Sequence, residues 1–387
     1  MVNQFSPWPS YTDEEIESVK NVLLSNKVNY WTGQECRKFE KEFASWSESK
    51  YAIALANGTL ALELALKVLN ICKGDEVIVT SRSYIASISS IINSGGTPIF
   101  ADIDLSTQNI TANTILPLIN NKTKAILCVH LAGWPCDMDD IMDIAKKYKL
   151  YVIEDCAQAH GAKYKGKSVG SIGHIGCWSF CQDKIMTTGG EGGMTTTNYE
   201  PLWKKMWAYK DHGKSYEAVY NRKHPEGFRW LHDTFGSNWR MTEMQAAIGR
   251  IQLKKMSIWR DKRNYNANKI WNAAKKCRLL RVPDIPDYIE HAAYKCYVFV
   301  RGSFKTRNKI MYDINKKSVP CFSGSCSEVY LENAFKKTTF RPKRRLPNAK
   351  ELGETSLMFM VHPTLTKKEI QKTCDVLTEV VSKNYND

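Results

Sequence analysis

The sequence contains no long uninterrupted apolar stretch. No run among the 387 residues approaches the roughly 18 consecutive apolar residues that a membrane-spanning helix needs. The first ten residues, MVNQFSPWPS, lack the basic-then-apolar pattern of a secretory signal. We therefore expect a cytoplasmic protein with no membrane partner.

Metal-binding and disulfide spacings are also missing. The 12 cysteines form no Cys-x-x-Cys pair and have no histidine partners at zinc-ligand spacing. These absences argue against both a zinc site and a disulfide framework, so we predict no metal. In a reducing compartment such cysteines are mostly small apolar residues of the core.

Acidic residues are few relative to basic ones. The chain has 55 Lys and Arg against 40 Asp and Glu, a formal net charge of +15. This excess favours either a nucleic-acid surface or attraction of small anionic ligands. Basic residues cluster at 336–345 and from Lys254 to Arg263, but no RNP, zinc-finger or helix-turn-helix signature accompanies them. We interpret the clusters as solvated basic surface and predict no nucleic-acid partner.

Between residues 51 and 199, short apolar runs alternate with amphipathic segments. The runs VIVT, PIFAD, AILCVH and YVIED are continuously apolar, as strands buried on both faces are. This alternation predicts an α/β fold with a parallel sheet that carries helices on its faces. Prolines and acids in VPDIPDYIEHAAY interrupt the pattern later. We predict a large domain of residues 1–255 and a smaller C-terminal domain of residues 256–387.

Three groups of polar residues follow predicted strands, where ligands of parallel sheets bind. Asn57, Gly58 and Thr59 lie between the strand YAIAL and a helix, so free backbone N–H groups and a hydroxyl there can hold an anion. An ordinary capped turn is the alternative. Glu154 and Asp155 end the strand YVIED, and a buried carboxylate must face a cation or a polar cleft. The alternative is a helix cap or an ion pair.

The third group is SFCQDKIMTTGGEGG, residues 179–193, which places Lys184 next to four glycines. Glycines let the backbone approach a bulky planar ligand closely, and Ser179 can hold a phosphate. A lysine acts as a nucleophile once desolvation or a neighbouring cation removes its proton. A cradle, a carboxylate, a serine and a lysine in this order predict a pyridoxal phosphate site, because that cofactor needs an acid at its ring nitrogen and an amine at its aldehyde.

The sequence resembles the sugar-nucleotide aminotransferases of the DegT/DnrJ/StrS group. The resemblance covers nearly the whole chain in blocks such as NYWTGQECRKFEKEF, ALANGTLALELAL, GDEVIVTSRSYIAS, VIEDCAQAHGA, GSNWRMTEMQAAIGRIQL and HPTLT. It implies the three-layer α/β/α architecture of fold type I pyridoxal phosphate enzymes. In that architecture a large domain with a mostly parallel sheet precedes a smaller α+β domain.

The resemblance also implies roles for single residues. Lys184 is the catalytic lysine that forms an imine with pyridoxal 5'-phosphate, and Asp155 is the partner of the pyridine nitrogen. Gln158 lies near the phenolic oxygen, and Tyr84 stacks on the ring, unless that tyrosine is a core aromatic. The phosphate is held by Gly58, Thr59 and Ser179.

Asn238 matches an asparagine that reaches the phosphate of the neighbouring subunit, which implies a homodimer with shared sites. Its alternative role is to cap the helix MTEMQAAI. His212 and His362 could border the substrate pocket, but their positions assign no role. Between Lys184 and Glu191 the chain has IMTTGG where many family members have one glycine, so the loop path and any role of Glu191 stay open.

Other lysines compete weakly for the role of Lys184. Lys163, Lys165 and Lys167 lie in AKYKGKSVG, which has the character of an exposed hairpin, and exposed lysines keep their protons. Relatives that act as dehydratases carry a histidine at the lysine position, so Lys184 argues against dehydration.

The predicted function is transfer of an amino group from L-glutamate to a nucleotide-linked keto-sugar of the 4-keto-6-deoxy or 3-keto type. The resemblance suggests a place in the biosynthesis of polysaccharides such as O-antigen. Two alternatives remain at this stage: an acceptor that is a small non-nucleotide keto compound, and a regulatory or nucleic-acid-binding protein built on the same scaffold.

Overall fold

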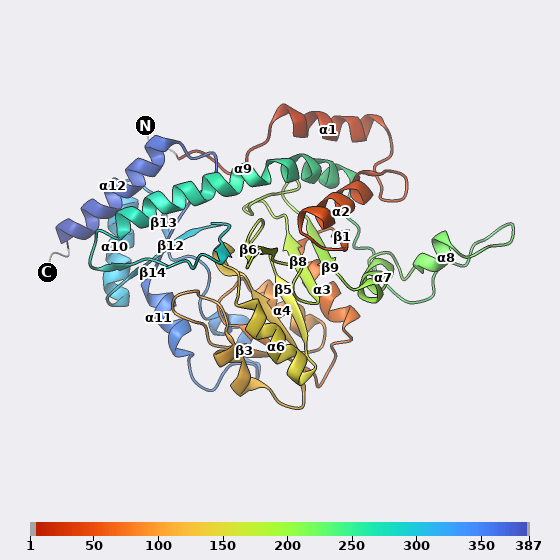
Figure 1. Cartoon of the computed structure of the whole chain (residues 1–387), viewed down its shortest axis with the longest axis horizontal. Helices are drawn as coiled ribbons and strands as arrows, with labels where there is room; N and C mark the ends of the chain where they lie inside the picture. The colour runs from red at the N-terminus through yellow and green to blue at the C-terminus, as the bar shows by residue number, and fades with distance from the viewer. Residues whose placement is uncertain (1–4, 385–387) are drawn as a thin grey trace.

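A computed structural model describes residues 5–384 of the chain. Its largest element is a seven-stranded sheet in the order β1-β9-β8-β5-β4-β2-β3 (Figure 1). Pairings among β3, β2, β4, β5 and β8 are parallel, whereas β9 runs antiparallel to both β8 and β1. The strands are β1 (Tyr51–Leu55), β2 (Glu76–Thr80), β3 (Thr97–Ala101), β4 (Thr123–Val129), β5 (Tyr151–Asp155), β8 (Ile175–Ser179) and β9 (Gly193–Thr197).

Helices cover both faces of this sheet. On β8, Cys177 packs in one apolar cluster with helix α3, and the next residue, Trp178, packs in another with helix α2. This alternation confirms the predicted α/β fold with a mostly parallel sheet buried on both sides. The helices of this part are α1 (Asp13–Leu24), α2 (Glu35–Trp46), α3 (Gly58–Val68), α4 (Ala86–Asn93), α5 (Ala112–Ile115), α6 (Met138–Tyr148), α7 (Glu200–Tyr209) and α8 (Tyr216–Tyr220).

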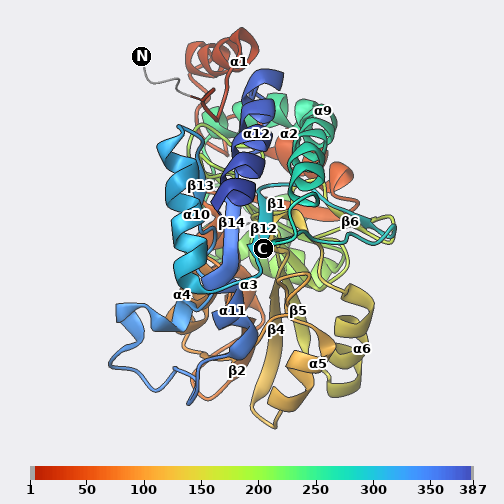
Figure 2. The same cartoon turned by 90° about the vertical axis from the view of Figure 1, so that its left-hand side faces the viewer.

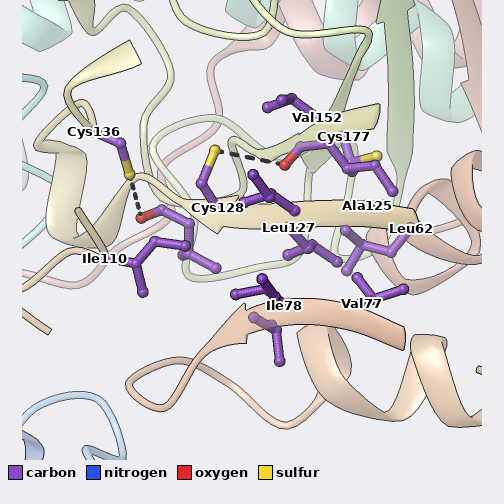
Figure 3. Packing of buried hydrophobic residues seen from close by; sticks show 14 of the residues in the cluster. Leu62, Val77, Ile78, Ile110, Ala125, Leu127, Cys128, Cys136, Val152 and Cys177 are labelled. Atoms are coloured by element: carbon purple, nitrogen blue, oxygen red, sulfur yellow. Dashed lines mark hydrogen bonds between the residues drawn. The ribbon is translucent and has the colours of Figure 1, made fainter. Parts of the chain in front are cut away.

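The core of the large sheet is formed by aliphatic side chains and cysteines. Figure 3 shows Ile78 of β2 and Leu127 of β4 in this core, with Cys128 donating to a backbone carbonyl at 3.6 Å. All the cysteines are free, and most are buried. The prediction that they serve mainly as small apolar residues is therefore confirmed.

The C-terminal part contains a second sheet, in the order β10-β12-β14-β13 with antiparallel pairings (Figure 2). Its strands are β10 (Leu280–Arg281), β12 (Cys296–Val300), β13 (Cys321–Phe322) and β14 (Ser356–Phe359), and its helices are α10 (Phe304–Lys316), α11 (Pro347–Thr355) and α12 (Lys367–Asn384). Short 3-10 turns occupy Leu116–Leu118, Leu131–Gly133, Val329–Leu331 and Asn333–Phe335.

A long helix, α9 (Glu243–Ala274), connects the two parts, contacting α1 and α2 near one end and α12 near the other (Figure 1). Thr242 caps it by accepting from the N–H of Gln245. The predicted boundary at residue 255 lies inside this helix, and the division into two domains stays a prediction. Among the described residues, no helix has the length and apolarity needed to cross a bilayer.

The segment AKYKGKSVG forms an antiparallel hairpin, as predicted. Its strands are β6 (Lys163–Tyr164) and β7 (Lys167–Ser168), which pair with each other. A third strand, β11 (Ile289–Glu290), pairs with β6 on the other side. On its surface, Lys165 forms an ion pair with Asp139 at 2.5 Å.

Candidate active site

A cleft of about 1030 Å³ opens at the carboxyl ends of the central strands. The large sheet contributes the ends of β5 and β8, the start of α3 and the loop after β2. The C-terminal part contributes the residues before and within β12 and the turn after β13. Predicted site residues that line the cleft are Gly58, Thr59, Tyr84, Asp155, Gln158, Ser179 and Lys184.

The N-terminus of α3 meets the end of β8 on the wall of the cleft that the large sheet contributes. Asn57 caps the helix, its side chain accepting from the N–H of Leu60 at 3.0 Å. The N–H groups of Gly58 and Thr59 belong to the first turn, so they have no partner within the helix. A Cβ at Gly58 would lie only 2.5 Å from the Cβ of Ser179 and 2.9 Å from its Oγ. Glycine at this position thus lets a serine hydroxyl sit beside a helix N-terminus, an arrangement that suits a phosphate.

Asp155 ends β5 and is buried at 4% exposure. Its carboxylate accepts from the Ser87 hydroxyl at 2.7 Å and from the Ala157 N–H at 3.1 Å. No cation of the described chain lies within 4.0 Å to form an ion pair with it. Burial raises the pKa of Asp155, although these hydrogen bonds and the charge of Lys184 act in the opposite direction. A buried carboxylate without a cation is well suited to a protonated ring nitrogen.

Glu154 points to the opposite face of the same strand. It accepts backbone N–H groups from Gly170 at 2.8 Å, Ile172 at 3.0 Å and Gly173 at 2.6 Å. The Nε2 of His130 lies 2.9 Å from it. Fully occupied in this way, Glu154 fastens a loop and has no free oxygen for a ligand.

Lys184 lies in the loop between β8 and β9 with its side chain 16% exposed. Its Nζ is 3.7 Å from the nearer carboxylate oxygen of Asp183 and 5.3 Å from the centre of the Tyr294 ring. Its backbone carbonyl accepts from Nε1 of Trp8 at 2.8 Å, so the N-terminal segment fixes this loop from outside.

The segment IMTTGG, residues 185–190, folds into a compact turn after the lysine. Ile185 and Met186 are buried, and the Thr187 hydroxyl donates to the Phe180 carbonyl at 2.8 Å. Gly190 has a φ of 118°, a conformation that glycine adopts readily, and donates to Thr187 at 3.1 Å. The first four residues of the segment are therefore buried, its two glycines return toward the surface, and Glu191 lines the cleft.

Tyr84 and Gln158 border the cleft in different ways. Tyr84 is 70% exposed, so the alternative of a core aromatic is wrong. Gln158 is buried, and its Oε1 accepts from the Ala132 N–H at 2.9 Å. Because its oxygen is engaged, the amide nitrogen of Gln158 is left as a donor.

Asn238 does not line the cleft of its own chain. It is exposed, and its backbone pairs with that of Asp211 in an isolated bridge. Since Thr242 caps α9, the alternative that Asn238 caps that helix is wrong. Neither His212 nor His362 lines the cleft. His362 is buried and stacks on Trp8, with ring centres 6.0 Å apart.

The sequence interpretation missed the site residues of the C-terminal part. Tyr294, Lys295, Tyr297 and Ser325 line the cleft, and the Ser325 N–H donates to the Tyr297 hydroxyl at 2.7 Å. These residues lie more than a hundred positions after Lys184 in a strand and a turn with no recognisable motif. Ser87 was missed too, although the small polar residues of SYIAS at a helix start were a usable signal.

A mostly parallel α/β sheet with a lysine, a buried carboxylate and a helix N-terminus suited to an anion at its strand ends has the groups that a pyridoxal-phosphate-dependent transferase requires. The chain belongs to the DegT/DnrJ/EryC1/StrS aminotransferase family, whose model matches residues 9–378. It is a sugar aminotransferase, and its cofactor is pyridoxal phosphate.

Known proteins resemble the chain over most or all of its length. An aminotransferase of known structure from Psychrobacter cryohalolentis is 62% identical, with a TM-score of 0.95 and coverage of 97% of this chain and 98% of that one. GDP-perosamine synthase from Escherichia coli O157:H7 is 46% identical over 64% of both chains. The dTDP-3-amino-3,6-dideoxy-alpha-D-galactopyranose transaminase of Aneurinibacillus thermoaerophilus is 33% identical over 94% of both.

Proposed function

We propose that this enzyme transfers an amino group from L-glutamate to a keto-sugar of the 4-keto-6-deoxy or 3-keto type carried on a nucleotide. The observation that carries the proposal is the shared cleft, in which Lys184, Asp155 and the Gly58–Ser179 cradle converge. Two relatives are named for sugars linked to GDP and to dTDP, and these names support a nucleotide-sugar acceptor. The excess of basic residues favours approach of an anionic diphosphate. We place the activity in the cytoplasm, in polysaccharide biosynthesis.

The residues present fit the cofactor. Bound pyridoxal phosphate supplies an aldehyde that takes up the amino group and a ring that withdraws electrons from the reacting carbon. In this proposal Lys184 Nζ would hold the cofactor at its aldehyde until the amino group of the donor displaces it, and the freed amine would then take the proton from the donor's α-carbon. Asp155 keeps the ring nitrogen protonated. The Gln158 amide nitrogen donates to the phenolic oxygen, and the exposed ring of Tyr84 stacks on the cofactor.

The phosphate is held by the N–H groups of Gly58 and Thr59 and by the hydroxyl of Ser179. Asn238 completes the site from a second copy of the chain, so the active form is a homodimer.

An exposed arm supports this part of the proposal. The loop after α8 extends away from the body in Figure 1 and exposes Phe228 at 73%, Trp230 at 76% and Phe235 at 100%. Aromatic rings this exposed are typical of an interface.

A panel of nucleotide keto-sugars incubated with the enzyme and L-glutamate tests the proposal. We expect a mass shift to the amino sugar for one member of the panel and none for small keto acids or free sugars. Reaction only with a small keto compound would contradict the nucleotide-sugar acceptor.

Lys184→Ala should lose both the visible absorption of the bound cofactor and turnover, and turnover that persists would refute the role of Lys184.

A further inference from the structure

The C-terminal wall of the cleft carries a cation that forms no ion pair with an acid of residues 5–384. Lys295 lies just before β12 and lines the cleft. Its Nζ is 4.7 Å from the centre of the Tyr294 ring and 3.6 Å from the sulfur of Met360. In the described chain, no carboxylate oxygen lies within 4.0 Å of this amine.

A second cation lies behind the first. Arg263 of α9 is 2% exposed and donates to the backbone carbonyl of Tyr294 at 3.3 Å. Its Nε and Nη2 have no hydrogen-bond partner among the described residues. The nearby carboxylate of Asp183 attracts both cations, but it is engaged by the Tyr294 hydroxyl and by Lys184. Arg263 also lies over the ring of Trp8, 4.9 Å from its centre, and does not line the cleft. Its buried charge adds to the positive potential at Lys295, and this favours an anion on the cleft side of that lysine.

The excess of positive charge around Lys295 affects the pKa of its amine. Burial, with the positive charges of Arg263 and Lys184, lowers the pKa of Lys295 to about 8, while Asp183 acts in the opposite direction. Burial and neighbouring positive charge, including Arg263 and Lys295, also lower the pKa of His362 to about 3, so this histidine adds no charge at neutral pH.

We propose that Lys295 is a specificity-determining residue that binds a carboxylate of the amino donor. This inference rests on the proposed function. The ring of Tyr294 contacts both amines, with its centre 5.3 Å from Lys184 Nζ and 4.7 Å from Lys295 Nζ. A group held by Lys295 is therefore next to the amine at which the chemistry occurs.

The position of Lys295 favours a donor carboxylate over a phosphate. Few bonds separate the carboxylates of an amino acid from its amino group, whereas a sugar ring separates the diphosphate of a nucleotide sugar from its keto carbon. The cofactor phosphate has its own place at Gly58 and Ser179, on the other wall of the cleft.

Half-reactions measured separately on the cofactor-loaded enzyme test the inference. Lys295→Gln should raise the dissociation constant of L-glutamate about 10- to 100-fold, because a charge-assisted hydrogen bond is lost. The visible absorption of the bound cofactor and the half-saturation by nucleotide keto-sugar should not change. Lys295→Arg should restore much of the affinity. Lys165→Gln, a surface lysine paired with Asp139, is the matched control and should behave as wild type.

Binding without reaction gives an independent readout. Glutarate, a dicarboxylate without an amine, should bind to wild-type holoenzyme in calorimetry and bind at least 10-fold more weakly to Lys295→Gln. Donor analogues then identify the carboxylate. If γ-aminobutyrate is insensitive to the substitution and L-2-aminobutyrate is sensitive, Lys295 holds the α-carboxylate, and the reverse assigns the distal one.

The outcomes separate the two proposals. An unchanged affinity for L-glutamate and glutarate in Lys295→Gln overturns the inference. A defect confined to the nucleotide keto-sugar half-reaction also overturns it and assigns Lys295 to a phosphate. Absence of amino transfer from glutamate in the wild type contradicts the proposed function instead.

Discussion

At the scale of single residues, the site depends on where charge is buried. Asp155 is a buried acid whose partners are a hydroxyl and an N–H group, and Lys295 is a cation on the cleft wall without a carboxylate beside it. Burial of each uncompensated charge lowers the stability of the folded protein, and a bound ligand of opposite charge offsets that free-energy cost. If the proposed roles of these residues hold, the apoprotein carries two electrostatic costs that binding of the cofactor and of the amino donor removes.

Replacement of Asp155 should separate stability from cofactor binding. Because burial raises its pKa, charged Asp155 disfavours the folded apoprotein, and this cost is present at neutral pH and fades as the pH falls through the raised value. Asp155→Asn should therefore melt at or above the wild-type temperature without cofactor. It should lose most of the thermal shift that pyridoxal phosphate gives the wild type. A large loss of apoprotein stability would contradict this reasoning.

Donor affinity should depend on pH through Lys295. The groups facing Lys295 are Asp183, Lys184, Arg263, Tyr294 and His362. Its lowered pKa means that the amine is charged below pH 8 and loses its proton above it.

Glutarate is the suitable ligand because it lacks the amine of glutamate, which would itself titrate at alkaline pH. The expected result is a glutarate dissociation constant that is flat between about pH 6 and 8 and rises above pH 8. In Lys295→Arg the constant should stay flat, since a guanidinium keeps its proton. A wild-type profile that matches the arginine variant would exclude Lys295 as the titrating group.

At the scale of elements, the contact between α3 and β8 builds the cradle. The helix starts with a glycine because the serine at the end of the strand occupies the space of a side chain. Gly58→Ala should destabilise the protein by about 1–3 kcal/mol through this overlap. It should also weaken cofactor binding, because α3 must move away from Ser179. Both effects are measurable by denaturant unfolding and by titration with pyridoxal phosphate.

A double variant tests the cause. Adding Ser179→Gly removes the Cβ that the new methyl group meets, so stability should recover while cofactor affinity stays low. If Gly58→Ala and Ser179→Gly are instead additive in stability, the steric explanation fails.

The sequence was informative wherever local pattern decides structure. The runs VIVT, AILCVH and YVIED became β2, β4 and β5, because a sheet buried on both faces requires continuously apolar strands. The antiparallel direction of β9 could not be predicted, since strand direction depends on the connection and not on composition. The C-terminal cleft wall was missed for a similar reason: the cleft forms only when β12 packs against the large sheet.

At the scale of the whole molecule, the site is incomplete within one chain if Asn238 acts on a neighbour. Asn238 is exposed, and neither Asn238 nor the aromatic arm lines the cleft of its own chain. Their proposed partner is a second copy of this chain.

Mixing of two impaired variants, assayed at a cofactor concentration too low to saturate Asn238→Ala, tests this arrangement. Asn238→Ala should lower cofactor affinity about tenfold or more, since it removes a hydrogen bond to a charged phosphate. Lys184→Ala should be inactive. Unfolded together and refolded, the two variants should form hybrid dimers that contain one unaltered site and regain part of the activity. Lack of recovery, with dimers confirmed by light scattering, would mean that Asn238 acts within its own chain or has no role.

The two acids at the end of β5 have a consequence for how the sequence can change. Glu154 holds a loop on one face of the strand while Asp155 serves the cleft on the other. Deletion or insertion of a single residue within this strand would exchange the two faces. The loop would then lose its hydrogen bonds to Glu154, and the cleft would lose the carboxylate of Asp155. We therefore expect changes in length to be tolerated in neighbouring loops but not in this strand.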